Sequence, residues 1–481
     1  MNAAEPLATL SLLLPEAILA AGIPAVLLAD MLAGKERKAA TVWVGLAACA
    51  AAAVATGMAA PGRIEGMVVV DGLVTFVRWV VLAVTACVLL VAAGDRELED
   101  RGAFTTCTLG IALGSAVTAV AANLLPLWLG LETVSLASYA LAAWKGGDRR
   151  AAEAGMKFVL FGGLASALML FGMSHVYGIT GHLDLHGIGQ ALPGMPGLAL
   201  AALAFVAVGI AYKLTIVPFH FYAPDVYQGA PALSVAAVSI APKVAATLVL
   251  ARGVQMAVPG ALAAPAAVGN TLALAAAASL VVAAFTALVA RDAKRIVAFS
   301  GIGHAGTAVL ALACLPGDGA LRAALFQLLA YAIGSTGALV CIGVLERDRG
   351  STRLDDLRGA SRERPWLVAL LCLFLFSLAG VPPLAGFLGK WAVLREALAF
   401  GLADPARHGV AVAGLLLLVT TALSAWAYLL VVRAVVLQPA AEPVPRARLP
   451  VGTALVLAVA ALLAVGVGLW LDGIAAVGAG S

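Results

Sequence analysis

The sequence predicts an all-α polytopic membrane protein with about 14 transmembrane helices. Of its 481 residues, 63% are hydrophobic and 12% are charged, whereas about a quarter of the residues of a soluble globular domain are charged. Apolar runs of about 20 residues, the length that crosses the hydrocarbon core, recur along the whole chain. These runs are continuous rather than alternating, so helices are expected rather than the strands of a closed barrel.

The expected spans follow one another with short connections. The first apolar run, from about Leu7 to Leu28, follows Glu5 and has no preceding Lys or Arg, so it is expected to be a retained span rather than a cleaved signal peptide. The stretch from Trp366 to Phe400 is too long for one straight helix and is counted as one broken span. The fourteen spans are centred near Ala20, Ala50, Leu82, Ala112, Leu131, Ala165, Val206, Val238, Leu280, Leu310, Ile333, Ala379, Leu417 and Ala460.

The positive charges of the loops test this count. Twenty of the 30 Lys and Arg residues, including Lys294, fall in loops on one side of the expected spans, and five, including Arg252, fall in loops on the opposite side. Such an excess is typical of cytoplasmic loops, so both termini are expected outside, on the periplasmic side of a bacterial inner membrane. The longest charged loop, Glu346 to Pro365, leaves room for a short surface helix. The segment Pro439 to Pro450 is expected to be an irregular linker.

Four lysines lie inside apolar stretches or at their edges: Lys157, Lys213, Lys243 and Lys390. An ammonium group at mid-bilayer costs at least ~2.5–3.5 kcal/mol, and ionisable groups at that depth are by default steps on an ion or proton path. The four lysines therefore predict a chain that moves charge across a bilayer. Lys157 opens its span at the inner face, so it also fits a lysine that extends to the interface.

Helix breakers accompany two of these lysines. Pro218 follows Lys213, and the group Pro382, Pro383 and Gly386 precedes Lys390. Proline removes a backbone donor and clashes with the preceding turn, and in lipid the freed carbonyls must face protein or water. Paired interrupted helices are the best indication in a sequence of a transport site in an inverted-repeat fold. The alternative is a pair of proline kinks without function.

Other ionisable residues at depth add to this pattern. Glu132 is the only carboxylate near mid-depth in the first half, and beside Lys213 it could stay charged and help hold the lysine protonated. His220 and His304 can change charge near neutral pH, although a lone histidine on an apolar helix is often a packing residue. Glu16, near the outer end of the first span, is interpreted as a helix cap.

Two motifs are rejected. The run Gly301 to Gly306 fits G-x-G-x-x-G but follows a basic loop and opens a membrane span, which is not the setting of a dinucleotide site. His182 and His186 have a plausible metal spacing but no third strong ligand. None of the six cysteines forms a C-x-x-C pair, so zinc, iron–sulfur and disulfide interpretations fail.

The segment from Lys213 to Pro231, KLTIVPFHFYAPDVYQGAP, resembles the core signature of the antiporter-like membrane subunits of respiratory complex I, the NADH-quinone oxidoreductase. Its P-D-V-Y-Q-G-A-P form is more similar to subunit N than to subunits L or M. The segments Lys294 to His304 and Leu378 to Lys390 are similar to the same family, and the likeness covers nearly the whole chain. Ala-Gly-Thr follows His304, where the family commonly has an aromatic residue.

The resemblance implies a domain organisation and a proton path. One membrane domain, 1–481, would contain a three-helix extension (1–95), two inverted five-helix repeats (about 103–252 and about 270–436) and a C-terminal helix (450–472). Glu132 would modulate Lys213 on the uptake side, Lys243 and His304 would connect the halves, and Lys390 would serve the exit side. The path residues expected from the lysines, the histidines and the resemblance together are Glu132, Lys157, Lys213, His220, Lys243, His304 and Lys390.

The resemblance also implies partners. NADH, FMN, iron–sulfur clusters and quinone would belong to other subunits, and this chain would bind no cofactor, metal or nucleic acid itself. Its partners would be the lipid bilayer and the adjacent membrane subunits. Three alternatives stay open: an Mrp-type cation/proton antiporter subunit, a membrane subunit of an energy-converting hydrogenase, and a purely structural membrane scaffold.

Overall fold

The computed structural model describes residues 11–32, 39–95, 98, 100–145, 147–192, 196–257, 265–317, 319–439 and 448–470. These residues are almost entirely helical, as the sequence predicts. Thirteen helices within them are long and apolar enough to cross a membrane. The predicted broken span is present as two helices, α18 (Pro365–Ala379) and α19 (Ala385–Leu402), which completes the fourteen expected spans.

By contact, the chain divides into two compact units, which are described separately. Unit 1 comprises residues up to 141, 159–213 and 237–263, and unit 2 comprises 142–158, 214–236 and 264 onward. The elements of unit 1 are α2 (Leu14–Leu32), α3 (Ala39–Met58), β1 (Gly62–Ile64), β2 (Val68–Val70), α4 (Gly72–Gly94), α5 (Arg101–Val120), α6 (Leu124–Ala142), most of α7 (Arg149–Thr180), α8 (Leu185–Ala191), α9 (Pro196–Leu214), α12 (Ala241–Arg252) and the π-helical η2 (Gly253–Ala257).

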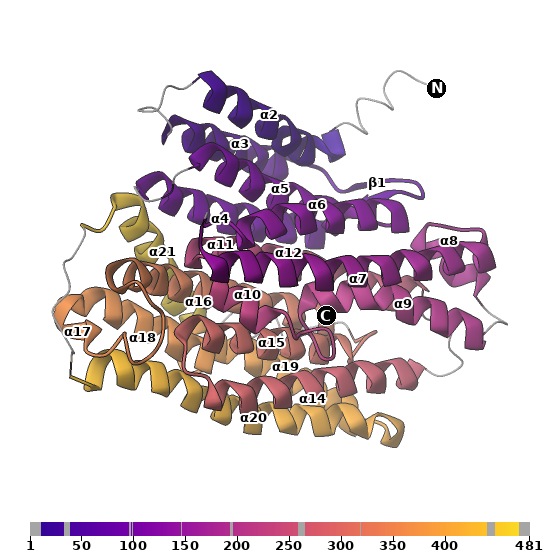
Figure 1. Cartoon of the computed structure of the whole chain (residues 1–481). Helices are drawn as coiled ribbons and strands as arrows, with labels where there is room; N and C mark the ends of the chain where they lie inside the picture. Colours follow the sequence, from indigo (N-terminus) through magenta and orange to yellow (C-terminus); the bar gives the residue numbers. More distant parts are fainter. Residues whose placement is uncertain are drawn as a thin grey trace. The chain divides into compact units, whose positions relative to one another are not determined.

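Unit 1 packs through small residues. Helices α2, α3, α4 and α5 lie side by side, and α12 packs on α4 and α5 (Figure 1). A Cβ atom on Gly114 of α5 would lie only 2.6 Å from the Gly130 carbonyl oxygen of α6. Membrane helices commonly approach through such residues, because lipid offers no hydrophobic drive for association. The antiparallel hairpin β1–β2, which the sequence analysis does not predict, precedes α4.

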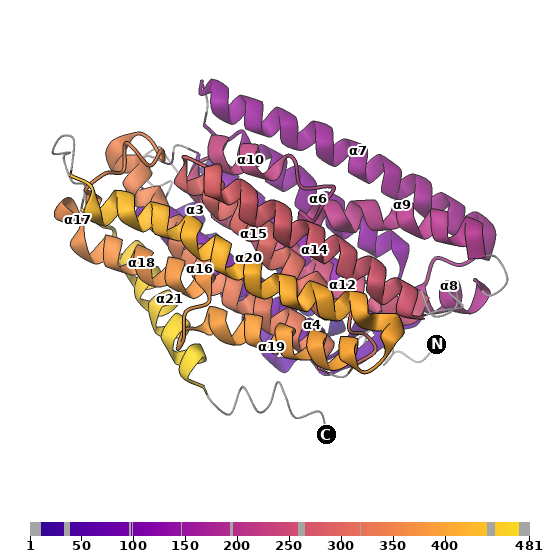
Figure 2. The ribbon, with the colours of Figure 1, turned by 90° about the horizontal axis from the view of Figure 1, so that it is seen from below.

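Unit 2 is built around α14 to α20. Its elements are α10 (Ala223–Gly229), most of α11 (Ala232–Ser239), α14 (Pro265–Val289), α15 (Ala293–Leu312), α16 (Ala320–Arg349), α17 (Ala360–Glu363), α18, α19, η3 (Pro405–Arg407), α20 (His408–Val432), the π-helical η4 (Arg433–Leu437) and α21 (Val451–Leu469). Helix α14 lies between α15 and α20, α16 packs on α15, α18 and α19, and α19 lies beside α20 (Figure 2).

One boundary differs from the prediction. The span expected near Leu310 is α15, which begins at Ala293, because Asp292 caps it by accepting the Arg295 backbone N–H. His304 therefore lies in mid-helix. The loop from Glu346 to Pro365 does hold a short helix, α17. The N-terminal part of the first run and most of the Pro439–Pro450 linker lie outside the described residues.

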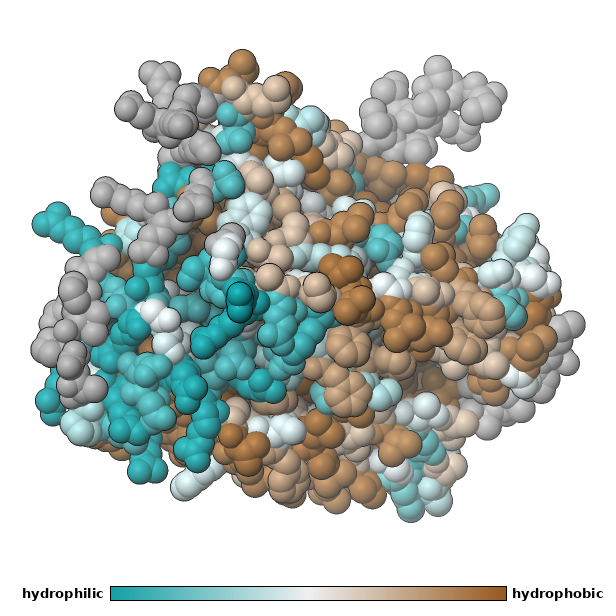
Figure 3. All heavy atoms as spheres, in the orientation of Figure 1, coloured by the Kyte–Doolittle hydropathy of each residue, from teal (hydrophilic) through white to brown (hydrophobic). Residues whose placement is uncertain are grey.

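The surface of unit 2 separates polar from apolar regions. Figure 3 shows hydrophilic residues gathered at the end where α17 lies, and a hydrophobic surface over α20. Exposed apolar side chains of α20 include Leu418, Val419 and Trp426. Large exposed apolar surfaces of this kind are expected where helices face lipid.

Candidate functional site

The first predicted helix break is present, and Lys213 lies directly before it. Lys213 is in the last turn of α9 and only 8% exposed. The helix ends at Leu214, and Thr215 adopts a positive φ of 59°, an uncommon conformation for a β-branched residue. The chain then turns through Pro218 before α10 begins at Ala223. The Lys213 ammonium thus belongs to the carboxyl end of a half-helix, where the helix dipole favours a cation.

Polar side chains accompany Lys213 in unit 1. The Glu132 carboxylate on α6 is close enough to act electrostatically on Lys213. One turn and two turns further along α6, Ser135 and Tyr139 continue the same face, and the Tyr139 hydroxyl hydrogen-bonds to Ser135 and Tyr212. The glutamate predicted to pair with Lys213 therefore shares its helix face with a hydrogen-bonded group of Ser135, Tyr139 and Tyr212.

The second break holds Lys390 by backbone carbonyls. Helix α18 ends at Ala379, Gly380 adopts a φ of +87°, and α19 begins at Ala385. The Lys390 Nζ reaches back and donates to the carbonyl oxygens of Leu378 at 2.9 Å and Ala379 at 3.0 Å. These are carbonyls at the end of α18, where the partial negative charge of the helix is concentrated. The break therefore creates a cation site.

Gly386 makes the second break compact. A Cβ atom at this position would lie 1.7 Å from the carbonyl oxygen of Ser377, so only glycine allows the first turn of α19 to touch the end of α18. Gly380 has a related constraint, because its φ lies in the left-handed region that favours glycine and a Cβ atom there would lie 3.2 Å from Lys390 Cδ.

Lys243 lies beside a third interruption that the sequence analysis did not predict as a break. Helix α11 ends at Ser239 and α12 begins at Ala241, so the span is interrupted at Ile240. Pro242 in the first turn of α12 lacks the N–H that would continue the ladder. Lys243 follows and is 3% exposed, which agrees with the predicted burial of its ammonium group.

His304 is buried among polar residues of α16. Its Nδ1 atom lies 2.6 Å from Gln327 Nε2, and its ring centroid lies 5.0 Å from that of Tyr331. Nearby, the Tyr428 hydroxyl donates to Ser300 Oγ. The sequence did not indicate a functional role for neutral polar residues such as Gln327 and Tyr331. A glutamine or a tyrosine often occurs in an apolar run without having a function.

Lys157 belongs to an ion-pair group with the aspartate of the P-D signature. Its Nζ lies 2.7 Å from Asp225 Oδ2 and 2.7 Å from Glu153 Oε1, and its side chain is 37% exposed. Asp225 Oδ1 also forms an ion pair with Arg295, 3.1 Å from its Nη1 atom. Asp225 thus joins α10, just after the first break, to α7 and α15. His220, within the break itself, is buried.

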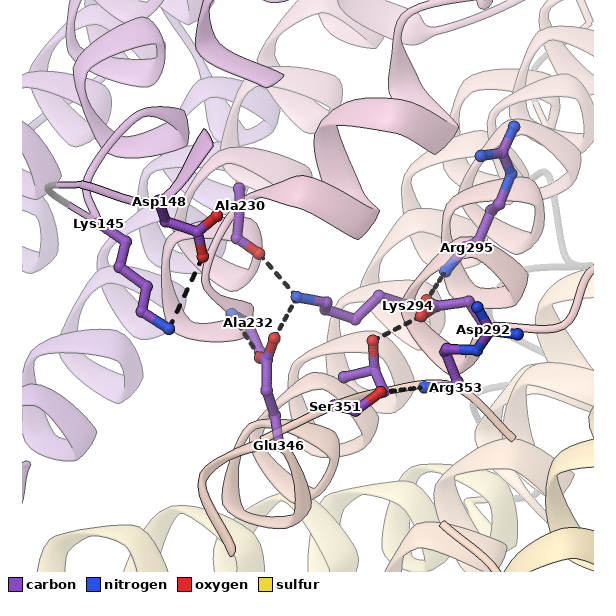
Figure 4. A network of polar contacts seen from close by, with 11 residues as sticks. Lys145, Asp148, Ala230, Ala232, Asp292, Lys294, Arg295, Glu346, Ser351 and Arg353 are labelled. Atoms are coloured by element: carbon purple, nitrogen blue, oxygen red, sulfur yellow. Dashed lines mark hydrogen bonds and ion pairs between the residues drawn. The ribbon is translucent and has the colours of Figure 1, made fainter. Parts of the chain in front are cut away.

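Lys294 corrects the interpretation of the loop charges. The sequence pattern assigns it to a loop, but it lies inside α15 and is 1% exposed. Its Nζ donates to Glu346 Oε1 at 2.5 Å and to the Ala230 carbonyl oxygen at 2.8 Å. Glu346 Oε2 accepts the Ala232 backbone N–H at 3.3 Å. Figure 4 shows this pair holding the short connection between α10 and α11.

Two buried arginine pairs in unit 1 also escaped the sequence analysis. Arg78 on α4 binds Glu16 through two hydrogen bonds of 2.8 Å, so Glu16 is an ion-pair partner rather than a cap. Arg252, counted above as a loop cation, is 3% exposed and pairs with Asp71 at 2.9 Å. Sequence order could not reveal either pair, because the partners lie far apart in the chain.

The two motifs set aside in the sequence analysis can be located in the structure. Residues Gly301 to Gly306 are helical within α15, so they form no phosphate-binding turn. His182 lies near Asp184, but among the described residues no group of three or more His, Cys, Asp and Glu side chains could hold a metal ion. The six cysteines are present as free thiols.

Membrane-length helices interrupted beside buried lysines define a membrane protein of the ion-transporter class. The chain belongs to the family described as NADH:quinone oxidoreductase/Mrp antiporter, transmembrane, which matches residues 121–416. Relatives and solved structures agree with this membership.

A protein named NADH-quinone oxidoreductase subunit N, from Anaeromyxobacter sp. strain Fw109-5, is 34% identical over 84% of this chain and 82% of its own length. A chain of the respiratory complex I of Thermus thermophilus is 32% identical, with a TM-score of 0.79 over 95% of this chain and 97% of its own. A chain of the Mrp complex of Dietzia sp. has a TM-score of 0.80 over 98% of this chain and 96% of its own. Its identity of 18% shows a shared fold alone.

Proposed function

We propose that this chain is a proton-translocating membrane subunit, of the subunit N type, in an NADH-quinone oxidoreductase. Quinone reduction in other subunits would drive proton transfer through it. The observation that carries this proposal is the placement of Lys390, whose ammonium group is held by the carbonyl oxygens of Leu378 and Ala379 at the end of a broken helix. The names of the relatives at 34–36% identity favour the same function.

In this proposal the buried lysines are successive proton sites. Glu132 and Lys213 form the uptake side, where the carboxylate acts on the lysine. Lys243 and His304 connect the two halves, and Lys390 forms the exit side. Each lysine alternates between an ammonium and a neutral amine as a proton passes.

Lys157 and His220 take supporting positions. Lys157 bridges Asp225 and Glu153, and this group fastens α10 just after the break that follows Lys213. His220 lies within the break. Both residues are placed to influence how the chain around the break opens to water.

The proposal includes an arrangement in the membrane. Residues of about 103–252 and about 270–436 would be two inverted repeats, each with a broken helix and a lysine beside it, preceded by the 1–95 extension and followed by the 450–472 helix. The basic loops would face the cytoplasm of a bacterial cell and both termini the periplasm. A membrane-impermeant maleimide added to intact cells should label Gln190→Cys and leave Arg358→Cys unlabelled; the reverse pattern would refute this orientation.

The driving force comes from partners in this proposal. NADH, FMN, iron–sulfur clusters and quinone would be bound by other subunits of the complex. Moving one elementary charge against 100 mV costs ~2.3 kcal/mol, so the partners must shift the proton affinity of the lysines by at least that amount for each proton carried fully across.

The test is the neutralisation of a buried lysine in the assembled complex. Lys213→Ala or Lys243→Ala should leave assembly intact and lower coupled quinone reduction and proton pumping about tenfold or more, because a proton site is lost. Lys145→Ala removes a 70%-exposed lysine and should change neither rate. An assembled Lys213→Ala complex that pumps like the wild type would refute the proposal.

The Mrp-type antiporter is the second candidate, since the Dietzia complex shares the fold. The two functions differ in what the isolated chain can do. As a complex I subunit, the purified chain in proteoliposomes should show no cation/proton exchange. Robust exchange under an imposed sodium or potassium gradient would favour the antiporter.

A further inference from the structure

Gln327 occupies a position between two of the proposed proton sites. It lies on α16, is 0% exposed, and places its Nε2 atom 2.6 Å from Nδ1 of His304 on α15. On its other side, a Cβ atom added to Gly389 of α19 would lie 2.4 Å from Gln327 Oε1. Gly389 directly precedes Lys390. The Gln327 amide therefore separates His304 from the turn of helix that carries Lys390.

The amide is only half satisfied. Gln327 Oε1 is a buried atom without a hydrogen-bond partner among the described residues. Buried polar groups in folded proteins are nearly always hydrogen-bonded, so an exception indicates an unseen water or a functional role. The oxygen lies against Gly389 of α19, one residue before Lys390.

The protonation of His304 determines which end of the amide it needs. A neutral imidazole with a bare Nδ1 accepts a hydrogen bond, which Gln327 Nε2 supplies. An imidazolium carries a proton on Nδ1 and donates it, which requires Gln327 Oε1 instead. The terminal torsion of glutamine is broad and roughly two-fold, so a half-turn of the amide exchanges the two ends without moving the rest of the side chain.

We propose that Gln327 is a positioning residue for proton transfer between His304 and Lys390, whose amide turns over with the charge of His304. When His304 is charged, Oε1 accepts from its Nδ1–H and Nε2 faces α19. As the amide turns away, the proton on Nδ1 is released to water and passes through water to the neutral amine of Lys390, and the amide keeps both of its N–H bonds. Nε2 then returns to Nδ1, and Oε1 accepts from the water beside α19. This inference rests on the function proposed above.

Two substitutions at Gln327 test the inference in the assembled complex. Gln327→Met keeps the length of the side chain but removes both hydrogen-bonding ends. Gln327→Glu keeps the shape but places an acceptor on both sides, which favours a permanently charged His304. Both variants should lower the number of protons pumped per NADH oxidised at least about twofold. Both should also raise the solvent deuterium isotope effect on coupled turnover.

The matched control is a second glutamine–histidine pair. Gln190 Nε2 lies 2.9 Å from His186 Nε2, but both side chains are at exposed positions of α8. Gln190→Met should leave pumping and the isotope effect unchanged. If Gln327→Met fails to assemble, Gln327→Glu carries the test, because its side chain has the same shape.

The outcomes separate this inference from the function on which it rests. Normal pumping and a normal isotope effect in assembled Gln327→Met and Gln327→Glu complexes would overturn the role of Gln327. Reduced assembly with an unchanged proton-to-NADH ratio would show that Gln327 is only structural, which also overturns it. An unaffected Lys213→Ala complex would instead overturn the proposed function itself.

Discussion

The buried pair of Arg78 and Glu16 allows a quantitative prediction. Arg78 Nε donates to Glu16 Oε1 and Arg78 Nη2 to Glu16 Oε2, both at 2.8 Å, and Nη2 also donates to the Leu12 carbonyl oxygen at 2.9 Å. The side chains are 1% and 7% exposed. Glu16→Gln preserves the volume of this site but removes the negative charge, so the guanidinium group is left buried without a counter-ion.

The size of the effect follows from this burial. Breaking a buried ion pair by removing one partner costs ~3–5 kcal/mol, whereas replacing both partners by apolar residues of similar size is often neutral or stabilising. We therefore expect Glu16→Gln and Arg78→Met each to lower the free energy of unfolding by ~3–5 kcal/mol. The double variant Glu16→Leu with Arg78→Met should lose less than either single variant.

The assay is unfolding of the purified chain in mixed micelles of increasing SDS fraction, followed by tryptophan fluorescence. The control is Glu65→Gln, which removes the partner of Arg63 in a pair that is 75% and 90% exposed. It should change stability by less than ~0.5 kcal/mol. The reasoning would be refuted if the free energy of unfolding fell in the double variant by the sum of the losses in the two single variants. The cost of each single variant would then not come from the partner that it leaves buried and unpaired.

Three further predictions concern the two breaks. Glu132→Gln removes the charge that favours a protonated Lys213, so it should reduce proton pumping more than Glu132→Asp does; equal losses would mean that geometry matters rather than charge. Pro218→Ala allows a more regular helix beside the first break. Labelling of cysteines introduced there should decrease while membrane insertion is maintained. Unchanged labelling would contradict a water-accessible break. Gly386→Ala places a methyl group 1.7 Å from the Ser377 carbonyl oxygen, so it should lower the free energy of unfolding by ~1–3 kcal/mol. The same SDS titration measures this loss, and a variant as stable as the wild type would refute the close contact.

The loop cations illustrate what a sequence pattern can and cannot predict. Counting Lys294 and Arg252 as loop charges is compatible with the predicted alternation of spans, because both lie near span ends. Their environment was wrong, because Glu346 and Asp71 approach them from distant segments and neutralise them in the interior. A hydropathy pattern depends on local composition, whereas a buried ion pair depends on which helices meet.

The breaks show the same division. Proline chemistry predicted both interruptions, since a missing N–H is a property of a single position. The interruption at Ile240 was not predicted as a break, although Pro242 marked the place. The binding of Lys390 to the carbonyl oxygens at the end of α18 depends on the contact between Gly386 and Ser377, which no local pattern contains.

The sequence by itself determined the class of protein, the number of spans, the two broken helices and the lysines beside them. The reason is that the bilayer penalises charge and unpaired backbone at every position separately, so the exceptions stand out in one dimension. Only the tertiary structure decided the partners: Glu16 for Arg78, Glu346 for Lys294, the α18 carbonyls for Lys390 and Gln327 for His304. Those pairings arise when helices far apart in the chain pack together, and neutral residues such as Gln327 acquire significance only through the neighbour that packing gives them.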